Sequence, residues 1–413
     1  MKHLLLVESN ESITGIQACQ ELGYTVTLIT QDIQHYLKGQ PLASHPLHRV
    51  DYIHEVDTFN EEAVVDFVKE YHKVHPLTGV MSFAEFYVVQ ATAAAHAIGV
   101  PTMHPLAAKN ARNKYKSREL CIQNGVPVPV SLLAGSVEEA CQHAQAMGYP
   151  CIIKPCDGAM SIGVVLVNNE RELRQAYDSY VNNRNYGRNL YGSADVLIEE
   201  FAAGPLVSVE MVTYQGKDVL IGITDRRLVG FPYFVETGAS FPVQLSNETE
   251  IVEAVSQGLR ALGVDFGPTH TEVALTPEGP KIIEFNPRMV GGPVPEMIKY
   301  ATGIHLPVEV LRMHMGEEPN LTATVSRGAA SREFCSPVDG TLLEVTGLKA
   351  LEGRPDILKS HFIAAGREVS YPRSNFDWIG RVTVGGDDAA QAEQKCSEIQ
   401  NGIGLHIVAR PLS

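Results

Sequence analysis

A segment that reads as a β-hairpin places two glutamates where they could share a cation. Residues 270–275 and 281–288 alternate apolar and polar side chains, and the intervening Thr-Pro-Glu-Gly-Pro favours a turn. A turn centred on Glu278 sets Glu272 directly opposite Glu284. Like charges at this spacing repel each other, unless a cation lies between them or one carboxyl is protonated.

The two faces of this hairpin are predicted to differ. The two-residue period of a strand puts Asn286 and Arg288 on the face of the two glutamates. The opposite face is apolar and is predicted to pack on the core: Val273, Leu275, Ile283 and Phe285. Carboxylate and amide oxygens beside an arginine suit Mg²⁺ that bridges nucleotide phosphates. The alternative is an exposed hairpin with two surface glutamates and a helix-capping asparagine.

A loop of small residues is a second candidate site. A strand that ends at Lys154 is followed by Cys-Asp-Gly-Ala-Met-Ser-Ile-Gly at 156–163 and then by another strand. Gly158 and Gly163 would let the backbone approach an anion. Ser161 could donate a hydrogen bond to that anion, and Lys154 would supply charge. A Walker loop would lead into a helix instead, and an ordinary hairpin loop is the alternative interpretation.

The end of a further predicted strand carries groups suited to a nucleoside: Glu199, Glu200, Phe201 and Ala202. Their backbone could contact an adenine edge and a carboxylate could bind ribose hydroxyls, or the acids could simply be solvated. In the next alternating strand, Glu210 would either line the nucleotide cleft or be exposed.

The elements that must position these residues indicate an α/β and α+β protein. Strand and helix patterns alternate up to about residue 105, which predicts a parallel sheet, and no G-x-G-x-x-G follows the first strand. A helix is predicted at about 106–124, with Lys114 in it, and a small α+β unit at 130–200. The next hundred residues are rich in strands, and the tail is expected to end in a helix from about Asp388.

Composition narrows the class of protein. The 413 residues are 44% hydrophobic and 20% charged, which is typical of a globular chain, and a net charge of −15 argues against nucleic acid or anionic membrane as partners. The apolar run at 4–7 is too short for a signal peptide, so a cytoplasmic protein without membrane contact is expected. Seven cysteines without a Cys-x-x-Cys pair favour reduced thiols.

Taken in order, these motifs resemble the ATP-grasp superfamily of carboxylate ligases. The series runs over nearly the whole chain, from Lys114 to the Glu-Phe-Asn-Pro-Arg motif at 284–288. The resemblance implies an ATP-grasp fold in three parts. These are an N-terminal parallel α/β domain (1–106), a two-lobed ATP-binding unit (107–318, with a small lid lobe at about 130–200) and a C-terminal closing domain (319–413).

The resemblance also implies a role for each motif. Contacts with ATP would come from Lys114, Lys154, Gly158, Ser161, Gly163, Glu199, Glu200, Phe201, Ala202 and Glu210. Glu272, Glu284 and Asn286 would hold Mg²⁺, with Mn²⁺ as an alternative ion. Arg288 would stabilise the transferred phosphoryl group or an acyl phosphate. A substrate carboxylate would attack the γ-phosphate, ADP would leave, and a nucleophile would then displace phosphate.

Four phrases narrow the resemblance to the L-amino-acid ligases, which join amino acids through an amide, as in dipeptide-antibiotic assembly of the bacilysin, tabtoxin or dapdiamide type. The phrases lie at 234–238, 267–272, 286–292 and 331–334. The substrate contacts so implied are Glu236, Gly238, His270, Arg288, Gly291 and Gly292. His270 would contact the amine or acyl group in catalysis, or only pack at the hairpin mouth. Amino acids or modified amino acids would be the substrates, and a homodimer is the default expectation.

Two other functions remain open. One is a purine-biosynthesis-type or formate-activating enzyme of the same superfamily. The other is a non-catalytic, nucleotide-binding regulatory protein that has kept the fold. Biotin carboxylation is disfavoured, because no lysine stands in a biotin-carrier context.

Overall fold

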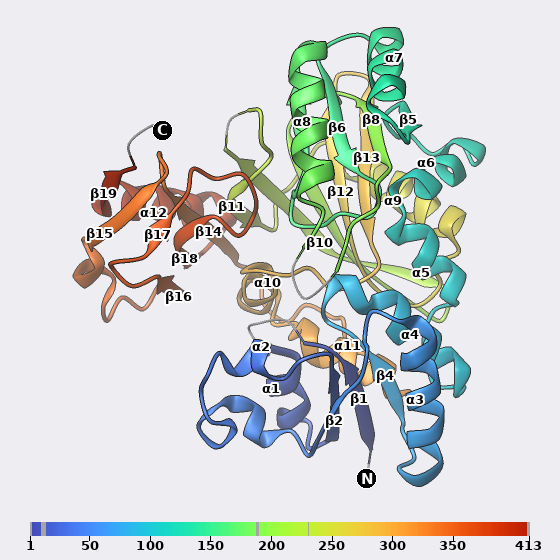
Figure 1. Cartoon of the computed structure of the whole chain (residues 1–413). Coiled ribbons are helices and arrows are strands. Elements are labelled where there is room, and N and C mark those ends of the chain that lie inside the picture. Colours follow the sequence, from blue (N-terminus) through green and yellow to red (C-terminus); the bar gives the residue numbers. More distant parts are fainter. Residues whose placement is uncertain (1, 10–13, 187–189, 230, 411–413) are drawn as a thin grey trace.

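The N-terminal part is a parallel sheet with helices packed around it (Figure 1). The computed structural model describes residues 2–9, 14–186, 190–229 and 231–410. The strands, in the order β3-β2-β1-β4, are β1 (His3–Val7), β2 (Thr25–Thr30), β3 (Tyr52–Glu55) and β4 (Gly79–Met81), and the helices are α1 (Thr14–Glu21), α2 (Gln34–Leu37), α3 (Glu61–Val74) and α4 (Val88–Ala97). The predicted parallel sheet is confirmed. The pattern of apolar residues did not reveal β3, which has no buried side chain.

A pair of short helices leads into a small four-stranded sheet. The helix predicted at 106–124 is in fact two, α5 (Pro105–Arg112) and α6 (Lys114–Gln123), because Asn113 leaves the helical conformation and caps α6. The sheet, in the order β5-β8-β6-β7, comprises β5 (Ser131–Ala134), β6 (Cys151–Pro155), β7 (Val165–Val167) and β8 (Val196–Glu200) with α7 (Val137–Met147) and α8 (Glu170–Asn182) packed on it. We call this unit the lid (top in Figure 1).

One eight-stranded sheet spans the rest of the chain, in the order β13-β12-β9-β10-β11-β14-β18-β16. Its strands are β9 (Leu206–Tyr214), β10 (Lys217–Leu228), β11 (Glu236–Phe241), β12 (Gly267–Thr276), β13 (Gly279–Asn286), β14 (Gly328–Cys335), β16 (Ile357–Phe362) and β18 (Trp378–Gly386), and its helices are α9 (Glu248–Leu262), α10 (Val294–Thr302), α11 (Leu306–His314) and α12 (Ala389–Gly402). Pairing of β11 with β14 carries the sheet across the boundary expected at 318/319, and the division into three domains stays a prediction.

A third small sheet completes the C-terminal part. It has the order β17-β15-β19, with β15 (Gly340–Thr346), β17 (Glu368–Val369) and β19 (Gly404–Ala409). The expectation that the tail ends in a helix is therefore wrong, since β19 follows α12 and pairs with β15. The predicted start of α12 is confirmed by Asp388, whose side chain caps it.

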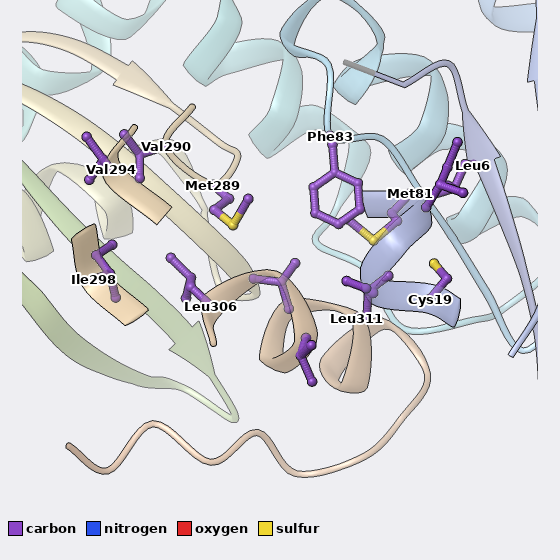
Figure 2. Close-up of a cluster of buried hydrophobic side chains, with 14 of the residues drawn as sticks. Leu6, Cys19, Met81, Phe83, Met289, Val290, Val294, Ile298, Leu306 and Leu311 are labelled. Carbon is purple, nitrogen blue, oxygen red and sulfur yellow. The ribbon is translucent and has the colours of Figure 1, made fainter. Parts of the chain in front are cut away.

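A buried cluster joins the N-terminal sheet to the segment after the hairpin (Figure 2). Met81 and Phe83, at the end of β4, belong to the same cluster as Met289 and Val290. Figure 2 shows Met289 and Phe83 on facing sides of this cluster. Burial of these apolar side chains therefore fixes the residues on either side of them, which carry the charges of the site.

The core face of the β12–β13 hairpin packs against α9. Glu272 lies opposite Glu284 as predicted, but the turn is the two residues 277–278, so Val273 pairs with Ile282 and the register shifts by one at Ile283. Ile282 is thus the buried core residue, and the prediction that Ile283 faces the core is wrong. This bulge turns Ile283 into the cavity described below.

Two further observations concern the cysteines and the helices. The seven cysteines all fall within the described residues, and each is a free thiol. Along the described ranges, no helix combines the length and apolar character needed to cross a membrane.

The contact between α9 and Phe285 gives a stability test. A Cβ added at Gly258 would lie 2.3 Å from the Phe285 ring. In a free helix, Gly→Ala gains up to about 1 kcal/mol. Overpacking costs about 1–3 kcal/mol, so we expect Gly258→Ala to lower the free energy of unfolding by up to about 2 kcal/mol. Urea denaturation followed by circular dichroism measures it.

The matched control is Gly402→Ala at the end of α12, where an added Cβ meets no heavy atom within 4 Å. It should leave the urea midpoint unchanged or raise it slightly. Equal midpoints for the two variants would contradict the predicted packing of α9 on the hairpin.

Candidate functional site

A cavity of about 300 Å³ lies where the lid, the hairpin, the N-terminal sheet and the C-terminal strands meet. Residues from each of these parts line it, including Lys154 from the lid, Glu272 and Glu284 from the hairpin, Glu85 from the N-terminal part and Arg381 from β18. Most of the predicted site residues reach this cavity. Among the lining residues that the structure describes, Gly163 and Glu210 are not included.

The facing carboxylates of the hairpin each have a basic partner from another element. Lys114 Nζ, at the start of α6, lies 2.6 Å from Glu284 Oε1. Arg226 Nη1, on β10, lies 3.2 Å from Glu272 Oε1. Burial alone would raise the pKa of the Glu272 carboxyl, but Arg226, helped by His270, lowers it below its usual value. Protein cations thus lie beside both carboxylates, where the sequence predicted a metal ion or a proton.

The oxygen donors at this place nonetheless fit Mg²⁺. Asn286 Oδ1 is buried and has no hydrogen-bond partner among the described residues. Asn286 lies opposite His270 in the hairpin, two residues along each strand from the Glu272–Glu284 pair. Two carboxylates and an amide oxygen leave half of an octahedral shell open, as is usual for Mg²⁺ that also binds phosphates and water. In keeping with such an incomplete shell, the described residues contain no cluster of three His, Cys, Asp or Glu able to hold a metal.

Glu199 lies beneath the cavity, where it holds two basic groups. Lys154 Nζ forms an ion pair with Glu199 Oε1, and Arg118 Nε donates to Oε2 over 3.0 Å. Ser131 Oγ donates to the same Oε2 over 2.5 Å. Burial, opposed in part by Glu199, lowers the pKa of Lys154. Glu199, one of the two acids from which a ribose-binding carboxylate was expected, is thus engaged by Lys154 and Arg118, since two buried cations need a buried anion.

The rest of the nucleotide motifs lie at the cavity rim. Glu200 Oε1 is 2.6 Å from Lys281 Nζ, and the adjoining Phe201 and Ala202 line the cavity. Gly158 and Ser161 of the loop also line it, and Lys114 Nζ donates to Gly158 O over 2.7 Å.

Gly163 has a conformational role behind the loop. Its φ is +73°, and an added Cβ would lie 2.9 Å from the Tyr180 ring. Glycine is therefore needed at this position for the backbone turn and for the packing of the loop against α8.

His270 lies at the centre of a hydrogen-bond chain across the sheet. Arg226 Nη1 is 2.8 Å from His270 Nε2, and arginine can only donate, so Nε2 accepts. The ring proton is then on Nδ1, which donates to Glu210 Oε2 over 2.9 Å. Glu210 also accepts from Ser208 Oγ and Thr224 Oγ1. Glu210, predicted to contact ATP, is instead buried behind His270 and orients it.

Arg288 is held by a residue that the sequence reasoning missed. Its Nε donates to Glu85 Oε2 over 3.1 Å and its Nη1 to Met289 O over 3.0 Å. Arg112 pairs with the other oxygen of Glu85. Burial opposes the charge, but Arg288 and Arg112 together lower the pKa of Glu85 to about 2. Glu85 thus links the N-terminal part to the end of the hairpin as a permanent anion.

The predicted substrate residues line the side of the cavity nearest the C-terminal strands. Glu236 Oε1 pairs with Arg226 Nη2 and accepts from Asn375 Nδ2 over 2.9 Å. A Cβ at Gly238 would lie 2.8 Å from the backbone oxygen of Ser331, so only glycine fits there. Gly291 faces open space, and Gly292 adopts a φ of +62°.

Several functional residues were not found from the sequence: Glu85, Arg118, Arg226, Glu333, Asn375, Trp378 and Arg381. A signal existed for Glu85, because it follows the carboxyl end of a predicted parallel strand, where ligand-binding residues gather in such sheets. Arg226 stands in an alternating strand, but no local pattern distinguishes it from the neighbouring Arg227. Glu333 lies in the segment 331–334 that carried part of the resemblance, whereas no local pattern marked Asn375, Trp378 or Arg381.

Three family models match the chain. Residues 16–102 match the ATP-grasp N-terminal domain, residues 147–295 the ATP-grasp domain, and residues 332–408 the L-amino acid ligase C-terminal domain 2. The crystal structure of an L-amino acid ligase from Bacillus licheniformis has a TM-score of 0.82 at 24% identity and covers 99% of both chains. These similarities establish the ATP-grasp fold.

Curated relatives match over most of this chain. An uncharacterized protein, y4rH of Sinorhizobium fredii, is 32% identical over 73% of the chain and 62% of its own length. Alanine–anticapsin ligase of Bacillus amyloliquefaciens is 26% identical over 79% of the chain and 72% of its own length. Human carnosine synthase 1 is 24% identical over 77% of the chain. The alignment spans only 40% of that last relative, so the chain is much shorter than it.

The buried Arg118 can be tested as the residue that fixes the lid to the hairpin. Arg118 donates to Glu199 in β8 and, over 2.5 Å, to Ile283 O in β13. Arg118→Met leaves part of the Glu199 charge buried without its partner. Breaking a buried pair in this way costs about 3–5 kcal/mol, so we expect a clearly lower urea midpoint.

Lys116→Met on the same helix is the matched control, because Lys116 is half exposed and pairs with Glu119, one turn further along the helix. Its unfolding free energy should change by less than about 1 kcal/mol. A similar loss in both variants would show that Arg118 has no special structural role.

Proposed function

We propose that this chain, an ATP-grasp protein similar to the L-amino acid ligases, is an ATP-dependent carboxylate–amine ligase that forms an amide bond between amino-acid-like substrates. The observation that carries the proposal is the hairpin face, where Glu272, Glu284 and the unpaired Asn286 Oδ1 lie together in one cavity with buried basic groups. Residues 1–106, 107–318 and 319–413 would be its three domains.

Positioning and charge are what such a phosphoryl transfer requires of the protein. Lys114 and Lys154 are the cations for the ATP phosphates, and the loop at 158–163 covers them. The backbone at Glu200–Ala202 is placed for adenine. Mg²⁺, or Mn²⁺ in its place, would be held by Glu272, Glu284 and Asn286 and would neutralise charge that develops on the phosphates.

Arg288 faces the same cavity as these cations and is the group for the acyl phosphate. In the reaction, a substrate carboxylate oxygen bonds to the γ-phosphorus as the bond to ADP breaks. The acceptor amine then attacks the acyl carbon and phosphate leaves. Glu85 holds Arg288 in place from behind, so its guanidinium is fixed before substrate binds, which is how preorganised charge lowers a barrier.

His270 and Glu236 act in this proposal as positioning residues. Both contact Arg226, which itself reaches Glu272. Their hydrogen bonds therefore connect the side expected to bind the substrates with the carboxylates expected to bind the metal. The substrates are small amino acids or their derivatives, nucleic acid and membrane are no partners, and a homodimer is the proposed assembly.

Glu284→Ala tests the hairpin. The protein, ATP and Mg²⁺ are incubated with pairs of amino acids, and ADP, AMP and phosphate are measured with product mass. We expect wild type to release ADP and phosphate when a carboxylate donor and an amine acceptor are both present. Glu284→Ala should lower this turnover at least about 100-fold, because it removes a carboxylate proposed to hold Mg²⁺ beside the reacting phosphates.

Glu278→Ala, in the exposed turn of the same hairpin, should keep full activity. Release of AMP would exclude an acyl-phosphate route. Turnover with formate or a ribonucleotide, but none with amino acids, would indicate a purine-type enzyme. No phosphate release from wild type or from the variant would indicate a non-catalytic protein.

A further inference from the structure

Three residues of the C-terminal strands line the cavity and have no role in the steps above. They are Glu333 on β14 and Trp378 and Arg381 on β18. Glu333 and Arg381 lie directly opposite each other in the pairing of the two strands. The strands that hold them therefore bring one anion, one cation and one aromatic ring to a single wall of the cavity.

Arg381 is fixed on two sides. Its Nε donates to Glu333 Oε1 over 2.6 Å. Its Cζ lies 5.2 Å from the centroid of the Trp378 ring. A salt bridge at Nε and an aromatic face together set the plane of the guanidinium, so little rotamer freedom remains to be lost when a ligand binds.

The outer edge of this guanidinium faces the cavity. Within the described part of the chain, no hydrogen bond to Nη1 or Nη2 of Arg381 is formed. A Cβ built on Gly292 would lie 3.9 Å from Nη1 and 4.0 Å from Nη2. The glycine thus leaves both nitrogens uncovered beside the turn that follows Arg288. Two parallel N–H donors at such an edge match the two oxygens of a carboxylate.

The neighbouring arginine is turned away from this place. Arg332 alternates with Glu333 on β14 and pairs with Glu393 of α12, on the other face of the sheet. Arg327, near the start of β14, is stacked on Tyr300. Arg381 is therefore the cation of the C-terminal strands that lines the cavity.

We infer that Arg381 binds the carboxylate of the acceptor, the amino acid whose amine attacks the acyl phosphate, and that Gly292 leaves the room for this carboxylate. This inference rests on the proposed amide-forming function. The other substrate, which is activated, loses its free carboxylate to phosphorylation beside the hairpin and Arg288. The acceptor amino acid keeps its own carboxylate throughout, so a second, separate carboxylate site is required. Arg381 supplies that site from β18, beside Gly292, which follows Arg288 by four residues.

The test compares each amine acceptor with its own carboxamide, which has the same amine and nearly the same size but no negative charge. An acceptor is first identified for wild type by product mass, using each standard amino acid. Then kcat and the KM for acceptor and for ATP are measured with the acid and with the amide. We expect wild type to prefer the acid clearly.

Arg381→Ala should raise the KM for the acid by about 10- to 100-fold, the loss of a charge-assisted pair. The KM for the amide and for ATP should change little, so the preference for the acid disappears. Arg381→Lys keeps the charge without the two-pronged geometry and should recover part of that preference. This second variant also provides the readout if the alanine variant does not fold.

Arg354→Ala is the matched control, because Arg354 also makes a two-pronged pair, with Asp356, but does not line the cavity. It should keep the wild-type preference. Equal losses for acid and amide in both Arg381 variants would overturn the inference, as would a wild type that uses the amide as well as the acid. A wild type that joins no amino acids at all would overturn the proposed function itself, which separates the two failures.

Discussion

The repulsion between two facing carboxylates is the constraint on which the rest of the site depends. Glu272 and Glu284 are adjacent across a hairpin, and a basic side chain from another element lies nearest to each of them. Lys114 reaches Glu284 from α6, and Arg226 reaches Glu272 from β10, which is separated from the hairpin by β9. Both elements must therefore be in place for the facing carboxylates to have their basic partners.

The same arrangement recurs at the other borders of the cavity. Glu199 draws Lys154 and Arg118 together beneath the lid, and Glu85 draws Arg288 toward the N-terminal sheet. Each anion joins basic groups from different segments. Buried charges are costly to desolvate, so such pairs contribute more to position than to stability. They hold the expected phosphate-binding groups in fixed places around an open volume.

The continuous eight-stranded sheet connects the hairpin with the C-terminal strands that line the cavity. β11 pairs with β10 on one side and with β14 on the other, so the C-terminal strands are in register with those that carry the hairpin. Asn375 reinforces this link, since its backbone N–H donates to Met160 O of the loop and its side chain contacts Glu236. The wall with Arg381 is thereby set at a fixed place relative to the ATP side.

Local patterns in the sequence determined the opposition of Glu272 and Glu284 and the loop after Lys154, because strand alternation and turn chemistry act over a few residues. The order of the motifs along the chain supplied the resemblance to the ATP-grasp superfamily. The tertiary structure alone decided the bulge at Ile283, which moved one apolar side chain from core to cavity. It also decided the partners of each charge. Glu210 and Glu199 turned out to orient other residues, since a buried carboxylate is directed by whichever cations the packing brings near. Glu199, for example, contacts Lys154 and Arg118, which lie 45 and 81 residues away in the chain. No local period in the sequence encodes contacts over such separations.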